Sequence, residues 1–257
     1  MIGYLCAYLR YYHPYEFITA YLNNANGEED VKNGNELATL YGIRIVPPRF
    51  GLSKDKYLLN TEEKVIAKGI SSVKYMNADV ANELYELAKA GKPKSFMDLL
   101  MQLDETTHLD TRQRDILVKI DYFAEYGNSK ELLRMVDFFS FFKNGTMKKI
   151  SKDKVTVELE PIIAQYATDK SKSGQPAKSY TFTDLPGLLR HLEVMVRDMH
   201  IQDFDLKSKM QIQLENLGYI DLTTNKKEDQ RKLVILDIYP LRSKKTKEIW
   251  AYALQVR

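Results

Sequence analysis

A glycine between two stretches of helical periodicity most constrains how this chain can fold. The segment Ile66-Ala67-Lys68-Gly69-Ile70-Ser71-Ser72-Val73 separates a predicted helix over 61–68 from a second helix that begins near Asn77. Glycine is favoured where a turn needs a positive φ or where another backbone approaches closely. Asn77 suits an N-cap, and apolar residues follow it at helical spacing. The segment therefore predicts a short hairpin between two helices.

Such a hairpin is typical of helix-hairpin-helix units, in which main-chain amides and the positive end of the following helix face a phosphate. Apolar-glycine-apolar turns are also common in plain helical proteins, so a purely structural turn is the alternative. If the hairpin binds a nucleic-acid backbone, the candidate contacts are Lys68, Gly69, Ile70, Ser71 and Lys74.

Composition limits the kinds of protein to which this chain can belong. Apolar residues make up 44% and charged residues 28%, so the chain can bury a core and extensive disorder is not expected. A net charge of +3 permits a nucleic-acid surface without requiring one. The single cysteine, Cys6, is expected in the core and fits a reducing cytoplasm. No apolar run reaches the roughly 18 residues of a membrane span, so we expect a cytoplasmic protein without membrane contact.

Periodicity predicts a mainly α fold that ends in a β-hairpin. Helices are expected over 3–24 with a kink at Pro14, and over 29–41, 61–68, 77–90, 95–103, 111–120, 129–142, 184–199 and 205–217. Short extended runs are expected at 43–46 and 57–59, a flexible loop at 170–176, and strands at 233–239 and 249–256. A lone two-stranded hairpin is marginal in water, so we expect the chain to be part of a longer protein.

Six segments follow an order that is known from one family of proteins. They are AYLRYYHPYEF at 7–17, GIRIVPPRFGLS at 42–53, KGIS at 68–71, SFMDL at 95–99, LVKIDYF at 117–123 and LVILDIYPL at 233–241. In this order they resemble the alpha subunit of bacterial DNA polymerase III, a C-family replicative polymerase. The family has AYLKAHYPxEF, GIxVLPPDINxS, KGVG, SLEDF and LIKAGAF, and then the first strand of an OB-type domain. Ser71 and Asp121 stand where the family has glycine, and Arg49 and Gly51 replace its Asp and Asn.

The resemblance implies a division of the chain and a function for it. Residues 1–28 would end the fingers, 29–145 would form the helix-hairpin-helix DNA-binding region, 146–224 would be a basic loop with connecting helices, and 225–257 would be the first hairpin of an incomplete OB-type domain. The whole protein would be a DNA-directed DNA polymerase, a nucleotidyltransferase that uses a divalent metal such as Mg²⁺. The family's catalytic carboxylates lie upstream, so no catalytic residue, metal ligand or cofactor is expected in this chain, which would be inactive alone.

The expected partners follow from the same comparison. Double-stranded DNA would contact the hairpin, and single-stranded template would contact a basic tip and a stacking residue of the OB-type hairpin, namely Lys244, Lys245, Lys247 and Trp250. A sliding clamp and other replisome subunits are implied by the resemblance only. The cluster 138–142 lacks the glutamine of a clamp-binding peptide and is expected to be helix core. The alternative function is a non-catalytic helical scaffold or regulatory interaction protein.

Overall fold

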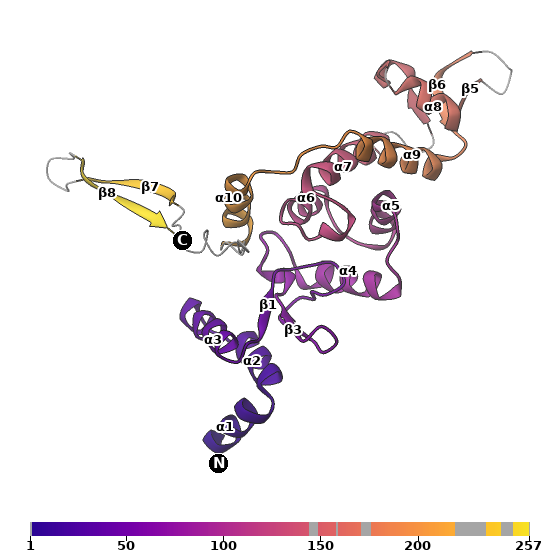
Figure 1. Cartoon of the computed structure of the whole chain (residues 1–257). Helices are drawn as coiled ribbons and strands as arrows, with labels where there is room; N and C mark the ends of the chain where they lie inside the picture. The colour runs from indigo at the N-terminus through magenta and orange to yellow at the C-terminus, as the bar shows by residue number, and fades with distance from the viewer. Residues whose placement is uncertain are drawn as a thin grey trace. The chain divides into compact units, whose positions relative to one another are not determined.

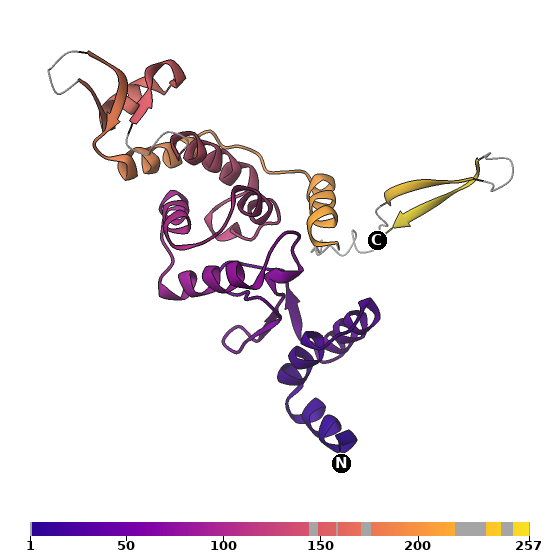
Figure 2. The same ribbon diagram turned by 180° about the vertical axis from the view of Figure 1, so that it is seen from behind.

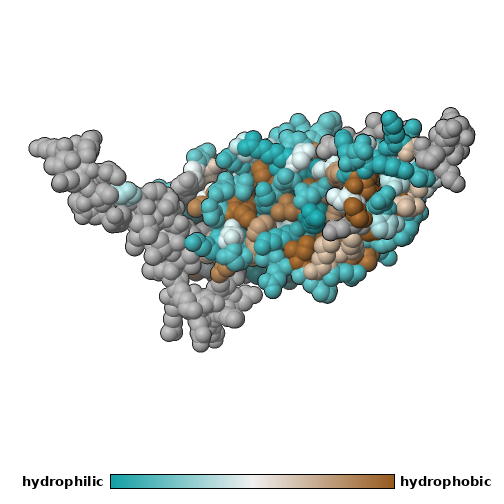
Figure 3. Space-filling model, turned by 90° about the horizontal axis from the view of Figure 1, so that it is seen from above, coloured by the Kyte–Doolittle hydropathy of each residue, from teal (hydrophilic) through white to brown (hydrophobic). Residues whose placement is uncertain are grey.

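The computed structural model describes residues 2–143, 149–157, 159–170, 176–218, 235–242 and 249–256. These residues form a mainly helical protein, as the sequence predicts, with small β-sheets of which only the C-terminal hairpin was predicted (Figure 1). On the face shown in Figure 3, hydrophilic residues surround separate groups of apolar residues, as on most protein surfaces. The chain divides into two units, Met1–Asp205 and Leu206–Arg257.

The N-terminal helical stretch breaks where the sequence predicts. Helix α1 (Ile2–Tyr12) is followed by α2 (Pro14–Asn23), because the proline lacks the amide hydrogen that a continuous helix needs. Helix α3 (Glu28–Leu40) comes next. Gly42 then takes φ 65°, the left-handed conformation in which many helices end.

A three-stranded sheet replaces the first predicted helix of the hairpin. The order of its strands is β1 (Arg44–Val46), β3 (Val65–Ala67) and β2 (Leu58–Asn60), with β3 parallel to β1 and antiparallel to β2. The prediction of a helix over 61–68 is therefore wrong. All three residues of β3 are buried. A strand buried on both faces carries a continuous apolar run, which over so few residues cannot be distinguished from helical periodicity.

In the part of the chain that the structure describes, the first unit contains five further helices with more than two turns. They are α4 (Ala78–Ala90), α5 (Phe96–Thr106), α6 (Thr111–Lys119), α7 (Ser129–Lys143) and α9 (Leu185–Asp198). Helix α7 packs against α5, α6 and α9, and both ribbon views show these helices together (Figure 1 and Figure 2). The predicted N-caps Asn77 and Ser95 are confirmed, because each side chain accepts a hydrogen bond from the amide three residues later.

Aromatic rings fill the core between these helices. The Phe123 ring lies 5.8 Å from that of Phe96, 5.5 Å from that of Phe50 and 4.9 Å from that of Tyr122, measured between centroids. The 138–142 cluster contributes its buried side chains from α7, namely Phe138, Phe139 and Phe142. The prediction that this cluster is helix core is confirmed for these three residues.

The turn between α6 and α7 contains one of the glycine replacements. Asp121 has φ 63°, a left-handed conformation that glycine favours and aspartate tolerates. The Ser129 hydroxyl lies 2.8 Å from the Val118 carbonyl oxygen and 2.6 Å from a carboxylate oxygen of Asp121. These contacts hold the chain at Asp121, although position 121 is not a glycine.

Glu193 on α9 fastens this helix to the first turn of α5. Its carboxylate accepts hydrogen bonds from the Ser95 hydroxyl at 2.5 Å and from the amides of Phe96 and Met97 at 3.2 and 3.0 Å. It also accepts one from the Arg197 guanidinium at 2.7 Å. Burial acts to raise the pKa of Glu193, but the hydrogen bonds from Ser95, Met97, Arg197 and Phe96 together outweigh it, so the pKa lies below its ordinary value.

A second sheet lies within the segment that was expected to be a basic loop. Its strands are β4 (Lys149–Ser151), β6 (Pro176–Phe182) and β5 (Ala167–Lys170), in that order and antiparallel, accompanied by α8 (Glu160–Tyr166). Composition alone did not predict these elements. The loop expected at 170–176 lies largely outside the described residues.

The second unit contains α10 (Leu206–Leu217), β7 (Ile235–Arg242) and β8 (Ile249–Val256). The two strands pair antiparallel, for example Ile238 with Leu254, so the predicted hairpin is confirmed. No helix in the described ranges is both long enough and apolar enough to cross a lipid bilayer.

Candidate nucleic-acid interface

Gly69 occupies the centre of the predicted hairpin in an extended conformation. Its φ is −74° and its ψ is 152°, so the residue does not need the conformational freedom of glycine. Instead, a Cβ atom here would lie only 2.6 Å from the Cα and the carbonyl carbon of Lys56. The sequence predicted either a positive φ or a close backbone approach, and the structure has the close approach. The approaching backbone is the protein's own 55–56 segment.

The amides of this loop are already used inside the protein. The Ile70 amide donates to the Lys54 carbonyl at 2.8 Å, and the Ser71 amide donates to the Asp55 carbonyl at 3.1 Å. The Ser71 hydroxyl also donates to Asp55, and Ile70 is completely buried. The expected contact between these two amides and a phosphate is therefore wrong for this conformation, because a backbone amide satisfied within the fold has no hydrogen left to donate.

The two lysines of the loop differ in exposure. Lys68 follows β3 and is half-buried, and its amide donates to the Val46 carbonyl at 3.0 Å. Lys74 is exposed, and its Nζ lies 5.4 Å from the centroid of the Tyr75 ring. What the loop offers to a ligand is thus positive charge on side chains. The DNA-binding role of Lys68 and Lys74 stays a prediction.

Tyr75 is a feature of this surface that the sequence reasoning missed. Its side chain is exposed, its φ is 66°, and its ring lies 3.6 Å from Cζ of Arg112 on α6. Its carbonyl accepts a hydrogen bond from the Gln113 side-chain amide at 2.9 Å. The only sequence signal was an aromatic residue directly after Lys74, because nothing local indicates that Arg112 lies above the ring.

An ion pair between Glu83 and His108 joins α4 to the segment before α6. The pKa of Glu83 is lowered, chiefly because its carboxylate accepts a hydrogen bond from the His108 amide at 2.8 Å. The pKa of His108 is raised, chiefly by the hydrogen bond between its ring and Glu83 at 2.6 Å. The stability that the charged His108 ring adds to the folded protein is therefore complete below its ordinary pKa of 6.5. It is lost as the pH rises through the raised pKa.

The other predicted site residues belong to the C-terminal hairpin. Lys244, Lys245 and Lys247 lie outside the described residues, and for Trp250 only the backbone, in β8, is described. The single-strand contacts therefore stay predictions. In the described ranges no group of three or more His, Cys, Asp and Glu side chains is placed to hold a metal ion. The expectation that the chain has no catalytic residue and no metal also stays a prediction.

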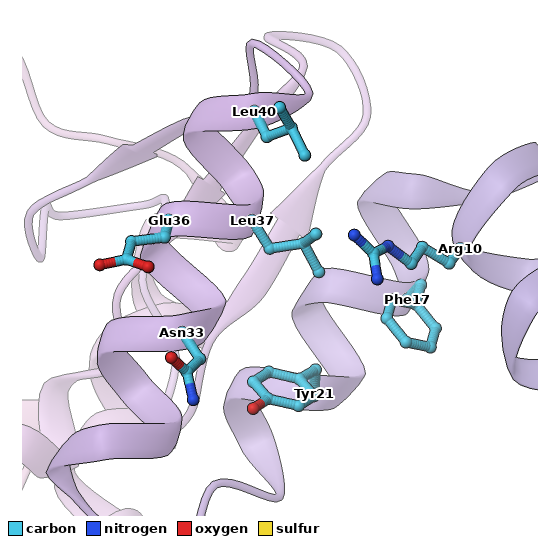
Figure 4. Close-up of a pocket in the computed structure, with 7 residues that line it drawn as sticks. All are labelled: Arg10, Phe17, Tyr21, Asn33, Glu36, Leu37 and Leu40. Atoms are coloured by element: carbon cyan, nitrogen blue, oxygen red, sulfur yellow. The ribbon is translucent and has the colours of Figure 1, made fainter.

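A second surface lies at the N-terminal helices. An open pocket of about 500 Å³ there is lined by Arg10 of α1, by aromatic side chains of α2 and by polar and apolar side chains of α3 (Figure 4).

Helix α1 buries none of its residues, so its aromatic side chains are exposed. The prediction that Cys6 is a core residue is wrong for the same reason, since the thiol on this helix is exposed.

No family model matches the chain, and no curated protein matches its sequence.

Proposed function

We propose that this chain is a duplex-DNA-binding portion of a C-family replicative DNA polymerase, which holds the sugar-phosphate backbone without reading the base sequence. Six segments that resemble the family in order support the assignment. The observation that carries the binding function is the convergence of the cations of Lys74 and Arg112 on the exposed ring of Tyr75, at the loop where the family has its hairpin.

In this proposal, side chains replace amides as the phosphate contacts. The amides of Ile70 and Ser71 fix the loop against residues 54–55, and the lysine side chains point their charge at the duplex. Such contacts position a protein on DNA but do not distinguish sequences. DNA synthesis, with its divalent metal, belongs to the complete polymerase. The helix-hairpin-helix character of 29–145, the OB-type character of 225–257, and the contacts to template and clamp are parts of the same proposal.

The alternative function, a helical scaffold or regulatory interaction protein, is favoured by a different observation. Helix α1 exposes Ile2 at 79%, Tyr4 at 74% and Tyr11 at 72% of their surface. Exposed apolar and aromatic side chains that lie this close together are more common on protein-binding surfaces than elsewhere on protein surfaces. In that case the loop at 68–74 is only a turn.

Binding of the wild-type chain to duplex DNA distinguishes the two functions. We expect fluorescence anisotropy to give the same affinity for labelled duplexes of unrelated sequence. The logarithm of the association constant should fall linearly with the logarithm of the salt concentration, by about 0.9 for each phosphate contacted. Absence of binding at low salt, together with a stable oligomer in light scattering, would favour the scaffold and contradict the proposal.

A further inference from the structure

We infer that Arg112 is a phosphate-contacting side chain of this surface and that Tyr75 positions its guanidinium. The inference rests on the proposed DNA binding and deepens it, because it adds a contact from α6 that no sequence motif indicates. The ligand it assigns to the site is the phosphodiester of a nucleic-acid backbone.

The first argument is the geometry of the stack. A distance of 3.6 Å between Cζ of Arg112 and the Tyr75 ring centroid places the guanidinium directly against the ring. Arg112 and Tyr75 are both exposed. Stacking on the ring restrains the long arginine side chain, while its N–H donors point outward in the plane of the guanidinium. Two of these donors can bind two oxygens of one phosphate.

The second argument is how Tyr75 is held. Its φ of 66° is unfavourable for an aromatic residue, and such conformations persist only where the surroundings enforce them. The enforcing group is Gln113, whose side chain donates to the Tyr75 carbonyl at 2.9 Å and accepts from the Asp110 amide at 3.0 Å. Gln113 is buried, and its own amide donates to Asp110 at 2.7 Å. The first turn of α6 therefore fixes both Arg112 and the ring on which it stacks.

The third argument is charge. Lys74 and Arg112 both approach the same exposed ring, and within the described part of the chain neither forms an ion pair. Two arginines of this unit, Arg190 and Arg197, do form ion pairs, with Asp98 and Glu193 respectively. Two cations that share one ring without a carboxylate are suited to a negatively charged group from outside the chain.

The test is duplex binding of the full chain carrying single substitutions. At about 50 mM salt, Arg112→Gln should weaken binding about 10-fold and reduce the slope of the salt dependence by about 1. Arg134→Gln is the matched control, because Arg134 is also exposed and lies over a ring, that of Phe138, at 4.8 Å. It removes the same charge and should leave affinity and slope unchanged.

Variants of Tyr75 test the positioning role without altering charge. Tyr75→Phe keeps the ring and should bind as the wild type does, whereas Tyr75→Leu removes the stack and should weaken binding about 3-fold. Thermal melting reports folding for every variant. If Tyr75→Leu lowers the melting temperature but binds like the wild type, Tyr75 has only a structural role and the positioning part is wrong.

The outcomes also separate this inference from the proposed function. If Arg112→Gln matches the wild type in affinity and slope while the loop lysine variants bind weakly, Arg112 does not contact phosphate although the chain binds DNA. If the wild type itself does not bind duplex at low salt, the proposed function and the inference both fail.

Discussion

Reversing both charges of the loop, by Lys68→Glu together with Lys74→Glu, should weaken duplex binding about 100-fold at about 50 mM salt. Each phosphate that a lysine neutralises releases a counterion, and at this salt concentration one such contact contributes about 10-fold to the association constant. Fluorescence anisotropy with a labelled duplex measures the effect. The single variant Lys74→Glu, at an exposed position, should weaken binding about 10-fold and does not disturb the half-buried Lys68.

A second double reversal controls for net charge. Lys149→Glu with Lys178→Glu changes the charge of the chain by the same amount at two exposed positions of the sheet β4-β6-β5. We expect this variant to bind nearly as well as the wild type. Equal weakening by the two double variants would show that overall charge, and not the loop, governs the affinity.

Glu193→Ala should reduce the free energy of unfolding by about 3 kcal/mol. The substitution leaves the buried amides of Phe96 and Met97 without the acceptor that they have in the wild type, and Arg197 without its carboxylate. Denaturation by urea, followed by circular dichroism, measures the loss. Glu125→Ala is the matched control, since its ion pair with Lys92 is well exposed to solvent, and such pairs contribute less than about 1 kcal/mol.

The same carboxylate predicts a dependence of stability on pH. The pKa of Glu193 is lowered in the folded protein. The stability that its carboxylate adds is therefore complete above its ordinary pKa of 4.5 and is lost as the pH falls through the lowered pKa. Glu193→Gln should therefore show a smaller loss of stability on acidification below this pH than the wild type does. An identical pH dependence in the variant and the wild type would contradict the assignment of the hydrogen bonds.

Local signals in the sequence located most helices. Amphipathic spacing, the N-caps Asn77 and Ser95, and the proline after His13 act over a few residues, and the structure has those elements where they were predicted. The short strand β3 was mistaken for a helix because three buried apolar residues have no distinguishing period. Strands β4 and β5, of three and four residues, lie among polar residues that composition assigns to loops.

The candidate site was predictable only in part, since its contacts join distant segments. The loop at 68–74 and its charges are visible in the sequence. Its amides, however, bond to residues 54–55, and the support of Tyr75 by Gln113 spans 38 positions. Glu193 reaches the first turn of α5 over 96 to 98 positions. No local pattern encodes such pairings, because they depend on how the helices pack.

Chemical footprinting of lysines tests most directly that this loop is where DNA binds. The chain would be acetylated with and without a saturating duplex, and the modification of each lysine followed by mass spectrometry. We predict that the duplex protects Lys68 and Lys74 and leaves Lys149 and Lys178 as reactive as before. Unchanged reactivity of Lys68 and Lys74 while the duplex is bound would contradict the account.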